Sequence, residues 1–351
     1  MIGGTPCDTK TTEQKTEPLV PPVRVGILGA GGLGRAAARI IGMKRELQLC
    51  AICDRQGYLA SWDGLDPEAV ASASGDLVTG YGRGVAGPEA IRCEDPIEAV
   101  LRVADRLDAI LVALPNLPNE FIPGVIRRFT EAGASLVFVD VLKRTRAVEQ
   151  MLALDPLVKR SCSVVMTGCG ATPGLLAASA VLAAQSFIEV EKVEIWWGVG
   201  IANWQAYRAT IREDIAHLPG YTVERAKAMT DEEVEALLER TNGVLELRDM
   251  EHADDVLLQR VGVVQRLDQV EVGGVMDTRH ARKPVSTTMT LTGITADGKR
   301  SSHKFILGDE TTMAANVIGP ALGYLKRGLW LKARGLFGVF GSTEFLPMVV
   351  R

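Results

Sequence analysis

The sequence predicts an α/β fold, in which a Rossmann-type doubly wound parallel sheet is followed by a second α+β domain built on a mostly antiparallel sheet. Three observations predict it. Apolar strands alternate with helical stretches from residue 23 to about residue 141, a glycine-rich turn joins the first strand to the first helix, and later strands follow one another with short turns. The 351 residues allow two domains at roughly 150 residues each.

Near-continuous apolar runs predict the strands of the first domain, because parallel strands are covered on both faces. These runs are residues 23–28, 47–54, 107–114 and 135–141. Helices are expected between them, at residues 33–46, from Asp95 onward and at residues 118–133. Asp95, Pro96 and Glu98 have the order of a capping residue, a first-turn proline and a third-position acid, which is typical of a helix start.

The pattern changes in the second half of the chain. One more strand is expected at residues 163–168, with Thr172 and Pro173 capping the helix that runs to residue 184. Strands are then predicted at residues 190–200, 243–249, 267–277, 285–294 and 301–308, and helices at 202–218, 230–240 and 311–325. Thr230 and Glu233 form a capping box.

We therefore predict four segments. They are a disordered polar tail (1–22), a dinucleotide-binding domain (23–145), an α+β substrate and dimerisation domain (146–310), and a C-terminal helix and tail that pack back toward the first domain (311–351).

Composition excludes several classes of protein. A balance of 39 Lys and Arg against 43 Asp and Glu argues against nucleic-acid binding, which needs cations to neutralise phosphates. The least interrupted apolar stretch, residues 175–184, is about half the ~20 residues that cross a bilayer. The first residues lack the basic start and apolar run of a signal peptide. We expect a soluble, cytoplasmic protein with no membrane partner.

The cysteines and histidines do not suggest a metal site. Cys50 and Cys53 form a CxxC, but they fall within a predicted buried strand, so buried thiols are favoured over a metal or redox site. The four histidines show no i,i+4 pair and no cysteine at zinc-ligand spacing.

The motif that carries chemistry is G-x-G-x-x-G, formed by Gly29, Gly31 and Gly34 directly after the first strand. The first glycine permits a tight turn, the second lets the backbone approach a pyrophosphate, and the third lets helix and strand pack closely. An ordinary glycine-rich turn is the alternative, but the strand, turn and helix together favour a dinucleotide site. The whole loop is a candidate cofactor site: Gly29, Ala30, Gly31, Gly32, Leu33 and Gly34.

The residues after the second strand bear on the choice of cofactor. Asp54 lies 25 residues after Gly29, where an acid is expected to bind the adenosine ribose. Its carboxylate favours NAD because it repels a 2′-phosphate, whereas Arg55 could pair with that phosphate. We predict NAD, with NADP as the alternative.

Ligands of open α/β sheets bind outside the carboxyl ends of the strands. At these ends lie Leu114, Pro115 and Asn116, then Asp140 and Lys143, and then Thr172 and Pro173. Leu114, Pro115 and Asn116 are candidates for contact with the cofactor. Helix capping is an equal alternative for Asn116 and Thr172, and a solvated loop pair is the alternative for Asp140 and Lys143.

With these motifs, the chain resembles the saccharopine dehydrogenase-like oxidoreductases and is also similar to meso-diaminopimelate dehydrogenase. Three features carry the resemblance over residues 23–330: the dinucleotide fingerprint, the segment 168–174 (GCGATPG), and the segment 197–203 (WGVGIAN) followed by a polar helix. Thr172 stands where the family usually has Asp, and Trp204 and Gln205 replace a more polar sequence.

The resemblance implies NAD(P)-linked chemistry at a C–N bond of an amino acid or opine-like carboxylate, and a homo-oligomer. Lys143 or His217 would carry the proton, with Asp140 tuning Lys143. The substrate residues it implies, at a site between the domains, are Thr172, Pro173, Trp197, Asn203, Arg208 and Arg212. A solvated helix face with Glu213 and Asp214 is the alternative for the two arginines, and a core anchor is the alternative for Trp197.

Two other functions stay open. Sugar-type NAD(P) oxidoreductases share the two-domain plan, but their Glu-Lys-Pro is Leu142, Lys143 and Arg144 here. A non-catalytic NAD-binding regulator would keep the fold and the glycine loop without chemistry in the second domain.

Overall fold

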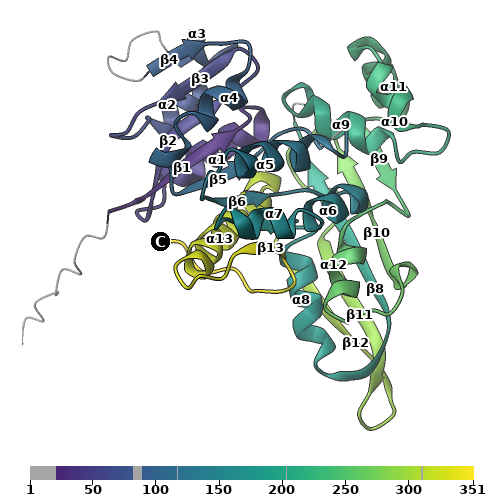
Figure 1. Ribbon diagram of the computed structural model, residues 1–351. Coiled ribbons are helices and arrows are strands. Elements are labelled where there is room, and N and C mark those ends of the chain that lie inside the picture. The colour runs from purple at the N-terminus through teal and green to yellow at the C-terminus, as the bar shows by residue number, and fades with distance from the viewer. Residues whose placement is uncertain (1–20, 82–88, 117, 203, 310) are drawn as a thin grey trace, which may run out of the picture.

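The structure, a computed structural model, contains two sheets that lie side by side, and a long C-terminal helix packs on the first of them (Figure 1). It describes residues 21–81, 89–116, 118–202, 204–309 and 311–351. All but the last two residues of the predicted disordered tail lie outside the described residues, as does the predicted substrate residue Asn203. The two sheets confirm the predicted fold class.

The first sheet has eight strands in the order β13-β7-β6-β5-β1-β2-β3-β4. Their bounds are β1 Val23–Leu28, β2 Leu47–Cys53, β3 Gly57–Ala60, β4 Glu89–Arg92, β5 Ala109–Val112, β6 Val137–Asp140, β7 Val164–Thr167 and β13 Gly338–Gly341. β1 pairs in parallel with both β2 and β5, and β5, β6 and β7 continue in parallel. The chain thus reverses its winding at β1, and the crevice between the ends of β1 and β5 is where ligands of such sheets bind.

Three strands of this sheet were not predicted from the sequence. β3 and β4 extend one edge as an antiparallel pair, and β13 extends the other edge in parallel with β7. Each has four residues and, unlike the equally short β5, β6 and β7, lies in no longer apolar run that would predict a strand. The sheet also takes in β7 and β13, beyond the predicted limit at residue 145. We therefore propose a first domain that includes β7 and that the chain rejoins at its C-terminus.

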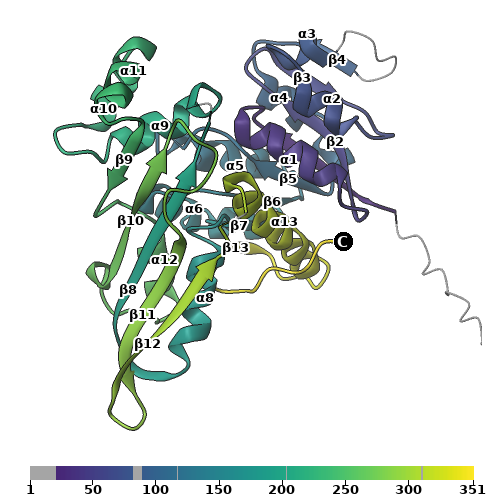
Figure 2. The same ribbon diagram turned by 180° about the vertical axis from the view of Figure 1, so that it is seen from behind.

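The second sheet has five strands in the order β12-β11-β8-β10-β9, and all five were predicted. Their bounds are β8 Phe187–Gly200, β9 Val244–Leu247, β10 Val270–Asp277, β11 Thr287–Thr295 and β12 Arg300–Leu307. The sheet is mostly antiparallel, but β8 and β10 run in parallel. One face packs on α8 and α12, whereas no helix lies in front of the other face in Figure 2.

The helices pack on both faces of the first sheet and around one end of the second. Those of the first half are α1 Gly32–Gly42, α2 Pro67–Ser72, α3 Leu77–Tyr81, α4 Pro96–Leu101, α5 Phe121–Glu131, α6 Thr145–Leu152 and α7 Asp155–Arg160. Those of the second half are α8 Leu175–Ala184, α9 Arg208–Ile215, α10 Val223–Ala228, α11 Asp231–Arg240, α12 Asp254–Arg260 and α13 Met313–Lys332. Short 3₁₀ turns are η1 Ala104–Arg106, η2 Trp204–Tyr207 and η3 Leu267–Gln269.

Two predicted helix starts are confirmed. Asp95 accepts the backbone N–H of Glu98, and Thr230 with Glu233 forms the full capping box. The predicted helix over 202–218 is instead η2 followed by the shorter α9. α13 is longer than predicted, and its buried residues Ile318, Leu322 and Leu325 join the core of the first domain.

Cys50 and Cys53 are buried and free within β2, as the buried-thiol interpretation predicts. Among the described residues, no three His, Cys, Asp or Glu side chains gather as a metal site would require. In the part of the chain that the structure describes, no helix has both the length and the apolarity needed to cross a membrane.

Candidate functional site

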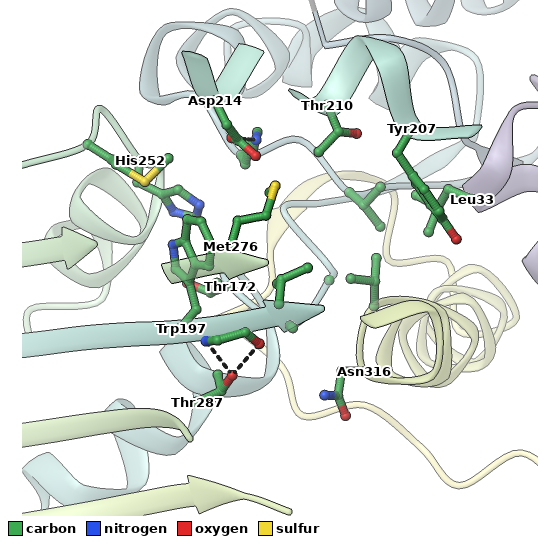
Figure 3. A pocket seen from close by; sticks show the side chains of 18 of the residues that line it. Leu33, Thr172, Trp197, Tyr207, Thr210, Asp214, His252, Met276, Thr287 and Asn316 are labelled. Atoms are coloured by element: carbon green, nitrogen blue, oxygen red, sulfur yellow. Dashed lines mark hydrogen bonds and ion pairs between the residues drawn. The ribbon is translucent and has the colours of Figure 1, made fainter. Parts of the chain in front are cut away.

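A cavity lies between the two domains and reaches the glycine-rich loop (Figure 3). Its walls come from the strand ends of the first sheet, from β8, α9 and the loop before α12, and from the first turns of α13. The lining residues are Leu33, Asn116, Val141, Lys143, Gly170, Ala171, Thr172, Trp197, Gly198, Val199, Tyr207, Thr210, Asp214, Met250, His252, Met276, Thr287, Leu307, Asn316 and Val317.

The glycine loop has the shape that a dinucleotide requires. Gly29 has a φ of +101°, and a Cβ there would lie 2.4 Å from the carbonyl oxygen of Ala113. A Cβ on Gly34 would lie 1.9 Å from the carbonyl oxygen of Gly29. At Gly31, by contrast, a Cβ would meet nothing within 4 Å, and Gly31 is the N-cap of α1, where no side chain makes a capping hydrogen bond. Open space over a bare helix N-terminus fits a pyrophosphate.

Two side chains fix the surroundings of this loop. Arg35, which sequence reasoning missed, donates to the carbonyl oxygens of Ala30, at 3.0 Å, and Gly75, at 2.9 Å. Asp54 accepts backbone N–H groups from Gln56, Gly57 and Leu77, at 2.8, 3.2 and 2.7 Å. Asp54 thus shapes the β2–β3 turn. Since a carboxylate has about four acceptor positions, it keeps capacity for a ribose hydroxyl.

Lys143 follows β6 and points into a buried ionic cluster. Its Nζ lies 2.6 Å from Oδ1 of Asp214 and 3.4 Å from Oε2 of Glu213, and both carboxylate side chains are only 3% exposed. Asn116 donates to the same Oε2 at 3.2 Å. Burial lowers the pKa of Lys143, but the two carboxylates outweigh burial and raise it above its usual value. Lys143 is therefore an ammonium group at neutral pH.

The partners of Lys143 correct two sequence-based interpretations. Glu213 and Asp214 are not on a solvated helix face, because the domains close over them. Asp140 does not tune Lys143: it is 1% exposed, and its Oδ1 accepts bonds from the backbone of Leu142 and Gly168 and from Thr167. It does not line the cavity. Asp140 instead holds together the turns that follow β6 and β7.

Asp140 leads to a prediction about stability. Burial raises its pKa to about 6, against the opposing effect of its hydrogen bonds. The folded state therefore holds this proton more tightly than the unfolded chain, so stability from this group is lost as pH rises from about 4 through about 6. Asparagine does not titrate, so we expect Asp140→Asn to remove that loss. The free energy of unfolding of the variant, relative to that of wild type, should rise by up to about 3 kcal/mol from pH 4 to pH 7. Urea unfolding at both pH values measures it, and a constant difference would contradict it.

His252 is a functional candidate that sequence reasoning missed. It lines the cavity, is 3% exposed, and its Nδ1 lies 2.7 Å from Oδ2 of Asp254. Thr172 donates its hydroxyl to the same oxygen at 2.6 Å. Thr172 therefore does not cap α8, whose N-cap is Gly174. Because Asp254 holds Nδ1, the other ring nitrogen of His252 is free to exchange a proton with a ligand.

Other predicted residues lie elsewhere. His217 does not line the cavity, and burial lowers its pKa to about 4, so it is neutral at physiological pH. Arg208 and Arg212 pair with Asp231, at 2.8 and 2.6 Å, and neither lines the cavity. The structure thus gives the two arginines an ion-pair role on α9 and α11. Pro173 does not line the cavity either.

Trp197 and the strand-end residues keep their predicted positions. Trp197 lines the cavity, and its ring packs where Gly274 leaves room, since a Cβ there would lie 2.2 Å from the indole. The backbone of Ala113 and Leu114 lies against Gly29. Asn116, Lys143, Thr172, Trp197 and Leu33 are thus brought together around one cavity.

Comparison with known proteins gives one curated relative of high similarity. The chain is 44% identical over 349 residues to (S)-8-amino-7-oxononanoate synthase BioU of Haloferax mediterranei, a match that covers 93% of this chain and 99% of the relative. No family model matches the chain.

Two solved structures share the fold. An engineered D-amino acid dehydrogenase bound to NADP+ is similar with a TM-score of 0.56 and 17% identity, over 92% of this chain and 94% of the other. The diaminopimelate dehydrogenase of C. glutamicum, in complex with DAP, has a TM-score of 0.53 and 17% identity, over 92% of this chain and 93% of the other. The resemblance to meso-diaminopimelate dehydrogenase is confirmed as a likeness of fold. The curated relative is not named as a saccharopine dehydrogenase.

Proposed function

We propose, from the premise that this chain belongs to the family of (S)-8-amino-7-oxononanoate synthase BioU, that it is an NAD(P)-dependent oxidoreductase acting on a C–N bond of that amino-keto carboxylate or of a precursor with the same chain. A member of this family is an enzyme, so the non-catalytic regulator is no longer a candidate. The observation that carries the proposal is one cavity lined by both Leu33 of the dinucleotide loop and the ammonium group of Lys143.

The glycine loop from Gly29 to Gly34 would hold the pyrophosphate, and Asp54 would bind the adenosine ribose. When bound, the nicotinamide gives or accepts the hydride. The part left to the protein is to orient the substrate, to exclude water and to move protons. A cavity closed by two domains suits the first two tasks.

Two groups that line the cavity suit proton transfer. Lys143 is held charged by Asp214 and Glu213, so it can donate a proton to a carbonyl oxygen or an imine nitrogen. His252 is oriented by Asp254 and can accept a proton from an amine or a water molecule. An acid and a base that face one cavity are what the making or breaking of an imine requires.

A single-turnover experiment tests this function. The chain, in excess over ligand and loaded with oxidised or reduced cofactor, is mixed with (S)-8-amino-7-oxononanoate, with and without ammonia. We expect the absorbance of the nicotinamide to change in at least one of these mixtures. A sugar-type oxidoreductase would instead respond to a polyol or an aldose, which serves as the comparison. No change with the amino-keto acid in any mixture would contradict the proposal.

The cofactor choice gives a second test. We expect NADH to bind more tightly than NADPH, because the carboxylate of Asp54 repels a 2′-phosphate. Fluorescence titration of both cofactors measures the ratio of dissociation constants. If NADPH binds about tenfold more tightly, a difference of about 1.4 kcal/mol, then Arg55 determines the choice instead.

The homo-oligomer also stays a proposal. The face of the second sheet that no helix covers in Figure 2 carries the outward side chains of β8 and β11, among them Trp196, Thr288, Thr290 and Thr292. An uncovered sheet face of this kind suits association with a second copy. We expect sedimentation to give twice the chain mass of 37.7 kDa, and a species of 37.7 kDa at micromolar concentration would contradict it.

A further inference from the structure

Asp214 is the only carboxylate among the described residues that line the cavity. Its side chain is 3% exposed, and its Oδ1 lies 2.6 Å from Nζ of Lys143. Among the described residues, none makes a hydrogen bond with the other carboxylate oxygen, Oδ2. One side of this buried carboxylate is therefore left for a ligand in the cavity.

The charges around Asp214 favour a cation as that ligand. A single ammonium group, that of Lys143, faces both Asp214 and Glu213, and no described atom makes a hydrogen bond with Oε1 of Glu213. Burial raises the pKa of Glu213 and Asp214 adds to the rise, against the opposing effect of Lys143. A carboxyl group with a raised pKa beside a second carboxylate lacks positive charge, and an ammonium group that enters the cavity supplies it.

Polar side chains continue from Asp214 along α9. Tyr207, Thr210 and Asp214 are three and four residues apart, a spacing that places them on one face of a helix, and all three line the cavity. In Figure 3 they follow one another along this side, from Tyr207 beside Leu33 to Asp214. The hydroxyl groups of Tyr207 and Thr210 have no hydrogen-bond partner among the described residues.

The other walls of the cavity are mostly apolar. Val199, Met276 and Val317 are among their side chains, and in Figure 3 Met276 and Trp197 lie across from Asp214. The polar groups of a bound molecule are therefore satisfied on the side of α9, and its alkyl chain is satisfied against the opposite walls.

The pairing of Lys143 with Asp214 suits two polar groups on neighbouring carbon atoms. Lys143 is a donor for a carbonyl oxygen, and Asp214 beside it is an acceptor for an ammonium group. An amino ketone carries both groups on adjacent carbons. A ketone without the amino group would cover Asp214 and leave its free oxygen unpaired, at the cost of an unsatisfied buried charge.

Other carboxylates close to the site are already engaged. Asp254 is fully buried, does not line the cavity, and accepts from Thr172 and His252 on one oxygen. Asp140 also lies outside the lining and accepts from the turns after β6 and β7.

We propose that Asp214, assisted by Thr210, binds the ammonium group that the substrate carries next to its carbonyl carbon, and that the site thereby selects amino ketones over plain ketones. The inference rests on the proposed function. With the ammonium group on Asp214, the neighbouring carbonyl oxygen lies at Lys143, and the alkyl chain runs along the apolar walls toward Met276.

The test compares two ligands by calorimetry, on protein saturated with the form of the cofactor that gives no absorbance change. The ligands are (S)-8-amino-7-oxononanoate and 7-oxononanoate, which lacks the amino group. We expect wild type to bind the amino ketone about 10- to 100-fold more tightly, the usual value of a hydrogen bond to a charged group. Asp214→Asn should remove most of this preference by weakening the amino ketone, while 7-oxononanoate changes only a few-fold.

Two further variants separate recognition from folding. Thr210→Val keeps the shape of a half-buried side chain and removes its hydroxyl, so we expect a loss of about 3- to 10-fold for the amino ketone alone. Asp268→Asn, at a carboxylate that is 72% exposed in η3, is the matched control and should change neither ligand.

The possible failures are distinct. If wild type binds both ligands equally, or if Asp214→Asn keeps the preference, the amino group is bound elsewhere and the inference is wrong. Equal losses of both ligands in Asp214→Asn and Thr210→Val would assign α9 a structural role only, which also overturns it. If wild type binds neither ligand, the proposed function itself fails, and the selection of amino ketones fails with it.

Discussion

Lys143→Ala is expected to lower turnover by about 10²- to 10⁴-fold while the affinity for the nicotinamide cofactor changes only a few-fold. The variant removes the ammonium group that faces the cavity and leaves the glycine loop, on another strand end, intact. Stopped-flow absorbance gives the rate of the chemical step, and fluorescence titration gives the dissociation constant of the cofactor. A rate within a few-fold of wild type would remove Lys143 from the mechanism.

This variant also carries a cost in stability that the experiment must separate from catalysis. Without Lys143, Asp214 and Glu213 are two adjacent buried carboxylates with no cation between them. Breaking a buried pair of this kind typically costs about 3–5 kcal/mol. Lys143→Ala combined with Glu213→Gln should regain part of this stability and none of the turnover. Lys159→Ala, which breaks an exposed pair with Asp155, is the matched control and should change neither.

Gly31→Val is expected to weaken dinucleotide binding by more than about 100-fold, or about 2.7 kcal/mol, with little loss of stability. A Cβ at Gly31 meets nothing within 4 Å and its φ is −70°, so the fold accepts a side chain there. That side chain would fill the space over the helix N-terminus into which the pyrophosphate must come. Loss of the glycine at an N-cap costs the fold only about 1 kcal/mol.

Gly34→Ala is the contrasting variant. Its Cβ would lie 1.9 Å from the carbonyl oxygen of Gly29, so we expect it to destabilise the first domain rather than to act on the ligand. Thermal unfolding and cofactor titration together distinguish the two glycines. Normal binding by Gly31→Val would show that this loop is not a cofactor loop.

The sequence predicted those parts of the fold that have a long or repeated signal. Continuous apolar runs predicted β1, β2, β5, β6 and β7, and series of strands joined by short turns predicted the second sheet. β3, β4 and β13 were missed because none of them lies in a longer apolar run, whereas the equally short β5, β6 and β7 do, and because the place of a strand at a sheet edge depends on the rest of the fold.

The site, too, could be predicted from the sequence only in part. Lys143, Asn116 and Thr172 could be predicted, because topology alone places strand ends at the ligand crevice. Their partners could not be predicted: Asp214 lies 71 residues after Lys143, and the two meet only when the domains pack. His252 has no local motif, and its interaction with Asp254 becomes visible only where the cavity is.

The central claim is that C–N chemistry linked to the nicotinamide takes place in the cavity that holds Lys143. The most direct test is a single-turnover mixing experiment with (S)-8-amino-7-oxononanoate and cofactor-loaded protein, which follows the absorbance of the nicotinamide in wild type and in Lys143→Ala. The account predicts a transient in wild type that is slowed by at least about 10²-fold in the variant. A transient of equal rate in both proteins, or no transient in wild type, would contradict it.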